Sequence, residues 1–161
     1  MIEDDNMINI IKADKSNIDM AYKIRLEAMC EINNIADDSA LSKDLKDNTM
    51  AYFSRDDQTT LLAVNDENEA VGCITICYID IMPTICHPSG KRAHLMNVYI
   101  NKNYRRQGIA RAMLEQIIDE ARQKGVTEIS LDATEMGTFL YKSCGFYKNN
   151  SAMLFTLNSD K

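Results

Sequence analysis

The chain has 161 residues, of which 45% are apolar, and this length suits one domain with one sizeable core. Its formal net charge of -6 argues against a nucleic-acid partner, because neutralising phosphates requires a broad basic face. No apolar run is long enough to cross a bilayer, and the opening MIEDDNM is acidic where a secretory signal would be basic and then apolar. We therefore expect a single domain over residues 1–161, cytoplasmic, with no membrane partner.

The cysteines are odd in number and scattered through segments of core-like composition. This favours reduced thiols in a reducing compartment. A zinc site would need thiolates and imidazoles at short paired spacings, whereas the closest pair, Cys73 and Cys77, would point to one face of a strand as core residues often do. We expect no metal. The other cysteines are Cys30, Cys86 and Cys144.

The first third of the chain predicts a strand and two helices. Residues 7–11 have the pattern of a strand. Ser16, followed three residues later by an acid, is typical of an N-cap and predicts a helix through Ile32. Ser42 in turn predicts the cap of a second helix, which includes Phe53.

Two segments rich in β-branched residues follow. TTLLAV, residues 59–64, and AVGCITICYI, residues 70–79, are separated by the polar turn NDENE. This pattern predicts a hairpin of antiparallel strands. HPSGKR, residues 87–92, predicts a loop before a further strand from His94 to Ile100.

The strongest amphipathic pattern comes next. Its apolar residues recur three and four positions apart and predict a long helix that ends near Lys124 and Gly125. We then expect a strand over residues 126–132, a short helix ending at Gly145, and a last strand over residues 151–157. This order of elements predicts a mixed α/β domain. The apolar positions of the long helix are Ile109, Ala110, Met113, Leu114, Ile117, Ile118 and Ala121.

Two arginines and one glycine occupy the connector between the strand that ends at Ile100 and the long helix, and a third arginine follows in the first turn of that helix. At a helix start the first amide N–H groups have no internal acceptor and carry the positive end of the helix dipole, so they bind phosphate well. Gly108 would let the backbone approach such a ligand closely, because it has no β-carbon. Arg105, Arg106 and Arg111 would add charge-assisted contacts to the remaining phosphate oxygens.

The composition of this connector does not by itself require a phosphate. A solvated basic loop with a glycine at its turn would have the same composition. The segment is not a Walker loop, since no Gly-Lys-Ser/Thr is present. It is not a dinucleotide fingerprint either, since the three-glycine pattern is missing and only Asp132 offers an acid after the following strand.

A family resemblance favours the phosphate site. Residues 105–110, RRQGIA, resemble the Arg/Gln-x-x-Gly-x-Gly/Ala signature of the GNAT superfamily of N-acetyltransferases, and LYKSCGF, residues 140–146, resembles its second motif. Together the match covers residues 91–147. The resemblance implies the GNAT fold, an α/β domain of mixed α+β type whose central sheet is mostly antiparallel, with a splayed parallel pair of strands at the cofactor site and flanking helices.

The resemblance also implies the co-substrate, acetyl-CoA. In this family the pyrophosphate lies on the amides of the signature loop, and the pantetheine arm pairs with the preceding strand like an extra strand. The implied acetyl-CoA contacts are Val98, Tyr99, Ile100, Arg105, Arg106, Gln107, Gly108, Ile109, Ala110 and Arg111.

The implied chemistry is transfer of the acetyl group to an amine. Tyr141 matches the tyrosine that acts as general acid toward the thiolate in many members, and a phenol with a pKa of about 10 is protonated at neutral pH. A core role is the alternative for Tyr141. His94 is a candidate base, and Asp132, Glu135, Glu27 and Glu31 are others, while many members instead release the proton to solvent through ordered water.

The acceptor is expected to be a primary amine on a small molecule such as a polyamine, an amino acid or an aminoglycoside, attacked directly in a ternary complex. Glu27 and Glu31 are candidate acceptor contacts, since they would attract a cationic amine. The alternatives are acetylation of a protein or peptide, a non-catalytic acyl-CoA-binding regulatory module, and an unrelated nucleotide-binding module. A homodimer is compatible with the resemblance, although no apolar stripe marks an interface.

Overall fold

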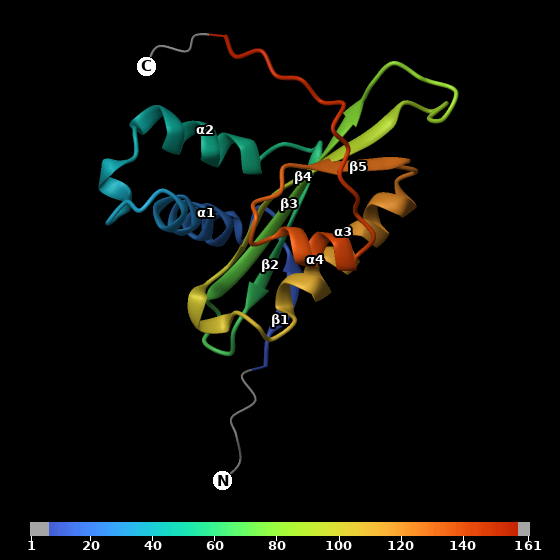
Figure 1. The fold of residues 1–161 in the computed structure, drawn as a ribbon. Coiled ribbons are helices and arrows are strands. Elements are labelled where there is room, and N and C mark those ends of the chain that lie inside the picture. Colours follow the sequence, from blue (N-terminus) through green and yellow to red (C-terminus); the bar gives the residue numbers. More distant parts are fainter. Residues whose placement is uncertain (1–6, 158–161) are drawn as a thin grey trace.

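A computed structural model describes residues 7–157 of the chain. A first strand and two helices are followed by three consecutive strands and then by a long helix, a strand and a short helix (Figure 1). The elements are β1 (Asn9–Lys12), α1 (Ile18–Ile32), η1 (Asp38–Ala40), α2 (Lys43–Phe53), β2 (Gln58–Val64), β3 (Ala70–Asp80), β4 (Lys91–Ile100), η2 (Lys102–Tyr104), α3 (Ile109–Gln123), β5 (Glu128–Leu131) and α4 (Thr138–Ser143).

The five strands form one sheet in the order β1-β2-β3-β4-β5. Every neighbouring pair is antiparallel except β4 and β5, which run parallel. The predicted hairpin is confirmed as β2 and β3, where Leu61 pairs with Ile74 and Leu62 with Cys73. The predicted fold class, a mostly antiparallel sheet with one parallel pair, is therefore also confirmed.

One face of the sheet is covered by α1 and α2. Ala21, Ile24 and Ala28, spaced three and four residues apart on α1, pack against Leu62 and Cys73 on the strands. Burying this apolar stripe is the main reason the helix is stable, because a helix of this length is marginal in water by itself. The second helix, α2, has no fully buried residue; it contacts α1, and its Phe53 packs against the edge of this cluster.

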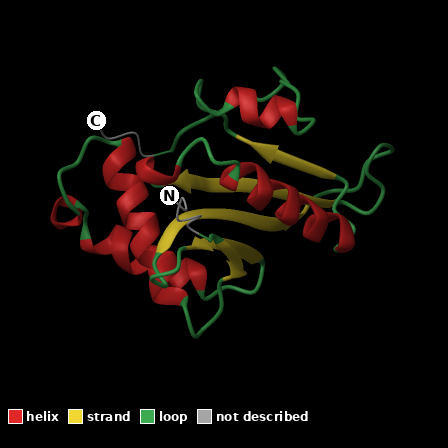
Figure 2. Ribbon diagram, turned by 90° about the horizontal axis from the view of Figure 1, so that it is seen from below, coloured by secondary structure: helices red, strands yellow, loops and turns green. Residues whose placement is uncertain are grey.

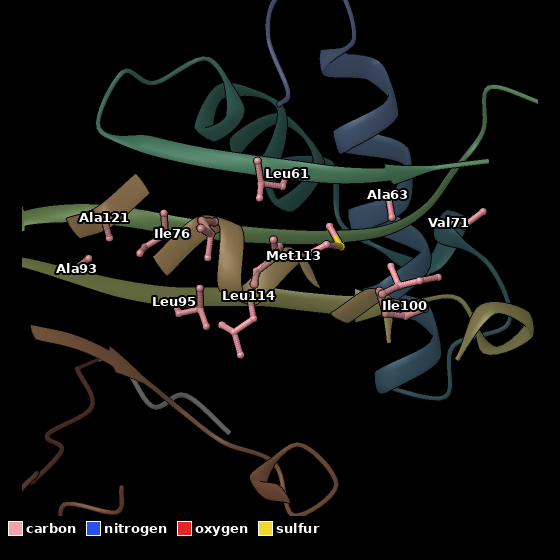
Figure 3. Packing of buried hydrophobic residues seen from close by; sticks show 13 residues of the cluster. Leu61, Ala63, Val71, Ile76, Ala93, Leu95, Ile100, Met113, Leu114 and Ala121 are labelled. Atoms are coloured by element: carbon pink, nitrogen blue, oxygen red, sulfur yellow. The ribbon is translucent and has the colours of Figure 1, made fainter. Parts of the chain in front are cut away.

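The opposite face is covered by α3, with α4 beside it (Figures 1 and 2). Met113, Leu114 and Ile117 of α3 are fully buried against Ile76 and Leu95 of the strands (Figure 3). The predicted long helix is confirmed at Ile109–Gln123, and this packing fixes its first turn next to the end of β4.

The structure differs from the sequence prediction at the end of the predicted loop, residues 87–92. Lys91 and Arg92 belong to β4, where they pair with Asp80 and Ile79 of β3. The strand therefore begins three residues earlier than His94. Pairing partners on β3 extend the strand through residues whose own composition resembles a loop.

The predicted last strand, residues 151–157, is wrong. Over residues 7–157 its backbone pairs with no strand, and Met153, Leu154, Phe155 and Leu157 are 77% to 97% exposed. A short run of apolar residues can suit a sheet, but a strand also needs hydrogen-bonding partners. Here the segment lies outside the sheet.

The two predicted helix caps have different outcomes. Ser42 caps α2 as predicted, since its side chain accepts a hydrogen bond from the Leu45 amide at 3.2 Å. The cap predicted at Ser16 is wrong, because Asn17 occupies the position before α1 and the Ser16 hydroxyl bonds Asp14 at 2.6 Å. Over residues 7–157, no helix combines the length and the apolar character needed to cross a bilayer.

Candidate functional site

The parallel pair β4 and β5 separates part of the way along β4. Their pairing runs from Arg92 and Glu128 to Leu95 and Leu131, while β4 continues to Ile100. Beyond Leu95, this edge of β4 has no strand beside it among the described residues. Unpaired backbone groups at such an edge are free to bond an extended ligand.

A bulge lies at the start of this open edge. The register between β3 and β4 shifts between Cys73 and Thr75, and Asn97 has a φ of +56°. A non-glycine residue in the left-handed region is uncommon and is tolerated best by Asn and Asp. Bulges often aim a side chain at a site, and this one turns the Asn97 amide towards α1.

The connector after β4 leaves a row of backbone amides without partners. Arg106 and Gly108 both have positive φ, at +64° and +79°, and Gly108 stands immediately before α3. Within residues 7–157, no backbone acceptor bonds the amides of residues 105–111, and the first helical bond runs from the Ala112 amide to the Gly108 carbonyl. The expected anion-binding geometry is therefore available.

The space beside Gly108 is open. A β-carbon built on this residue would meet no heavy atom within 4 Å. Gly108 also borders a surface hollow of about 220 Å³, which is lined on its other side by Ile10 of β1 and by Ile8, just before that strand. The connector can thus be approached from solvent, as a phosphate ligand requires.

The two arginines of the connector and Arg111, in the first turn of α3, have different surroundings. Arg105 donates from Nε to the Ile100 carbonyl at 2.8 Å and forms an ion pair with Glu31. Arg111 bonds the Ser143 hydroxyl at 2.7 Å and lies 3.3 Å from the Glu115 carboxylate. Arg106 has neither an ion pair nor a side-chain hydrogen bond within the described part of the chain.

Glu27 and Glu31 lie on one side of α1 and both face the end of β4. The Tyr99 hydroxyl lies 2.6 Å from Glu31 Oε2 and 3.0 Å from Glu27 Oε1, and the Asn101 amide donates to Glu27 at 2.7 Å. The hydrogen bond from Tyr99, followed by that from Arg105, lowers the pKa of Glu31. Burial, with the two carboxylates adding to it, raises the pKa of Tyr99. These contacts tie α1 to β4, and an acceptor-binding role for either glutamate stays a prediction.

Tyr141 lies on α4 and is half-buried against the core under α3. Its ring meets Phe146 edge-on with centroids 5.9 Å apart, and a β-carbon on Gly137 would lie 2.9 Å from its Cε2. Burial raises the pKa of the phenol, so the protonated form is favoured. Its hydroxyl makes no hydrogen bond within residues 7–157 and is available as a proton donor.

His94 lies in the paired part of β4. Its Nδ1 is 2.8 Å from the Ser130 hydroxyl of β5, and its Nε2 is 3.7 Å from Asp132 Oδ2. The ring is therefore held in place from both sides, while Glu135 makes no comparable contact with it. No group of three or more His, Cys, Asp or Glu side chains that could hold a metal ion occurs over the described residues.

The sequence analysis missed a polar chain that crosses the sheet below α1. Arg25 donates from one Nη to Asn97 Oδ1 at 3.3 Å, and the Asn97 amide donates to the Thr75 hydroxyl at 3.1 Å. Thr75 is 2.8 Å from the Thr60 hydroxyl, and both threonines are buried. Arg25 lies on the largely apolar side of α1. This charged residue within the apolar stripe was the only feature of the sequence that could have indicated the polar chain.

Comparisons with known proteins indicate the family. The model of the acetyltransferase (GNAT) family matches residues 22–146. N-acetyltransferase 8 of Homo sapiens is 30% identical over 118 residues, which are 71% of this chain and 50% of that protein. The ribosomal protein bS18 alanine N-acetyltransferase of Escherichia coli (strain K12) is 39% identical over 57 residues, or 34% of this chain and 38% of that protein.

The chain spans about half the length of the human relative that it matches. Among solved structures, a predicted acetyltransferase with acetyl-CoA from Clostridium acetobutylicum has a TM-score of 0.81 at 24% identity, covering 93% of this chain and 96% of that one. This likeness shows the fold. With the family match over residues 22–146, it follows that the chain belongs to the acetyltransferase (GNAT) family.

Proposed function

We propose that this chain transfers the acetyl group of acetyl-CoA to a primary amine of a small molecule, by direct attack in a ternary complex. The observation that carries the proposal is the row of unpartnered amides at residues 105–111, which directly follows the open edge of β4. One element offers donors for a pyrophosphate and the other offers a strand edge for the pantetheine arm. A ligand with both parts, in that order, matches acetyl-CoA.

The cofactor-binding residues have separate tasks in this proposal. The amides around Gly108 bind the pyrophosphate, and Arg106, which has no partner within residues 7–157, adds a charge-assisted contact. The backbone of Val98, Tyr99 and Ile100 bonds the pantetheine arm. Arg105 holds the loop through the Ile100 carbonyl and Glu31, so its contribution is to position the amides.

Acetyl-CoA supplies an activated acetyl group with a thiolate leaving group. The neutral amine of the acceptor attacks the carbonyl carbon, the carbon–sulfur bond breaks, and a backbone N–H of β4 stabilises the negative charge that develops on the carbonyl oxygen. Tyr141 donates its proton to the departing thiolate, which its raised pKa permits at neutral pH. His94, held by Ser130, is our candidate for taking the proton from the amine.

A protein N-terminus is the second candidate acceptor. It is favoured by the similarity to the enzyme whose name gives an alanine of ribosomal protein bS18 as its target, although the aligned part covers 34% of this chain. An acceptor of this kind would have to lie in an extended conformation across the α1 and α2 side of β4. Short peptides therefore belong in the same assay as small amines.

The experiment combines a thermal-shift measurement with acetyl-CoA and an assay of thiol release across polyamines, aminoglycosides, amino acids and short peptides. Stabilisation by acetyl-CoA with turnover of a small amine supports the proposal. Turnover of peptides alone supports the second candidate. Stabilisation without any turnover would indicate a non-catalytic acyl-CoA-binding module, and no stabilisation would overturn the acetyl-CoA site itself.

A further inference from the structure

Arg25 is a half-buried cation without an acidic partner in the described part of the chain. It extends from α1 to the bulge in β4, where it donates to Asn97 Oδ1 at 3.3 Å, its one side-chain hydrogen bond among these residues. Within residues 7–157, it forms no ion pair with a carboxylate. The residues one turn away on α1 are Ala21, Tyr22, Ala28 and Met29, so the helix supplies no acid either.

An unpaired guanidinium in this position is costly. Burial lowers the pKa of Arg25, which means that the surroundings disfavour its charge. Two other half-buried arginines have acidic partners, since Arg92 is paired with Glu128 and Arg105 with Glu31. Arg106 lacks such a partner among residues 7–157, and it is the arginine that we assign to the pyrophosphate. A carboxylate from outside the protein would offset this cost, because it would pair with the guanidinium in surroundings that are partly shielded from water.

The position of Arg25 suggests which ligand brings that anion. The unpartnered amides lie at the start of α3, whereas α1 lies on the opposite face of the sheet (Figure 1). If acetyl-CoA follows the open edge of β4, the face beside α1 is left for the acceptor. Asn97, which contacts Arg25, directly precedes Val98 in this edge.

We propose that Arg25 binds a carboxylate of the acceptor, so that the substrate is an amino acid whose amino group is separated from its carboxylate by only a few bonds. A guanidinium presents planar donors that match a carboxylate, and the bond to Asn97 fixes its orientation while leaving other N–H donors free. This inference rests on the proposed function and narrows it.

The same charge disfavours other acceptors. Polyamines and aminoglycosides carry several cationic groups and no carboxylate, so Arg25 repels them. A peptide or protein N-terminus has no carboxylate near its amine, because that carbon is part of a peptide bond. Arg25 therefore distinguishes free amino acids from polyamines, aminoglycosides and peptides.

The test compares free amino acids with the corresponding amino acid amides in the thiol-release assay, using the whole chain with acetyl-CoA. The amides keep the amine and the side chain and lose only the negative charge. We expect at least one amino acid to be acetylated with a kcat/KM about tenfold or more above that of its amide. Arg25→Met should remove this preference by raising KM for the amino acid, while the amide is affected little.

Lys23→Met is the matched control, because it removes an exposed cation from the same helix and changes the net charge equally. It should leave the preference intact. Calorimetry should give the same acetyl-CoA affinity for wild type and both variants. A preference that persists in Arg25→Met, equal loss on both substrates, or acetyl-CoA binding with no turnover of any free amino acid would each overturn the inference. Failure to bind acetyl-CoA would instead overturn the proposed function.

Discussion

The Tyr99 hydroxyl donates a hydrogen bond to the Glu31 carboxylate across 2.6 Å and so joins β4 to α1. The same carboxylate also pairs with Arg105, whose Nε holds the Ile100 carbonyl. One glutamate thus connects the first helix, the end of the open strand and the amide-rich connector. The two faces of the sheet are linked at the point where we place acetyl-CoA.

Tyr99→Phe should lower the free energy of unfolding by about 1 to 2 kcal/mol, because the two glutamates lose a donor that is only partly replaced by water. Tyr22→Phe is the matched control, since the Tyr22 hydroxyl makes no hydrogen bond within residues 7–157. Denaturant unfolding measures the free energy of unfolding of each variant. Equal stabilities of the two variants would show that the Tyr99 bond contributes nothing.

Gly108→Asp should abolish acetyl-CoA binding, because it places a negative charge where the pyrophosphate meets the amides. The φ of +79° strains most side chains, but Asn and Asp tolerate this region, and nothing in the protein blocks a β-carbon there. Gly108→Asn therefore controls for shape without charge and should retain more affinity. Calorimetry measures the affinity of each variant for acetyl-CoA. Equal affinity of Gly108→Asp and wild type would refute the phosphate assignment.

Tyr141→Phe should lower kcat by about a hundredfold or more and leave acetyl-CoA affinity nearly unchanged. The packing against Phe146 is kept and only the proton donor is removed. Tyr147→Phe, at a position that is 79% exposed, should have wild-type turnover. If Tyr141→Phe is as active as wild type, Tyr141 is a core residue and the proton comes from elsewhere.

Alkaline pH should destabilise the fold through its half-buried tyrosines. Burial is the first cause that raises the pKa of Tyr52 and of Tyr78 to about 12. An unfolded tyrosine ionises near a pKa of about 10, so between these values the unfolded state releases a proton that the folded state retains. The free energy of unfolding should therefore fall as pH rises above about 10. Tyr78→Phe should make this fall less steep, and an unchanged slope would contradict the assignment.

Local sequence patterns predicted much of the fold and the connector. The three- and four-residue repeat of α3, the hairpin of β2 and β3 and the cap at Ser42 all depend on neighbours a few residues apart. The position of Gly108 directly before α3 was predicted for the same reason, since it depends only on where the strand ends and the helix pattern begins. These features are determined locally, and the sequence by itself was enough to find them.

The partners of the charged side chains were decided by the tertiary structure. Arg105 faces Glu31 from 74 residues away and Arg25 meets Asn97 from 72 residues away. The last predicted strand failed for a related reason, because residues 151–157 have a strand-like pattern and no strand beside them. Sequence determines which residues suit a helix, a strand or a turn. Only folding determines which distant groups come into contact. Arg105 and Arg106 are neighbours in the sequence, but in the folded chain Arg105 is paired with Glu31, whereas Arg106 has no side-chain partner among residues 7–157.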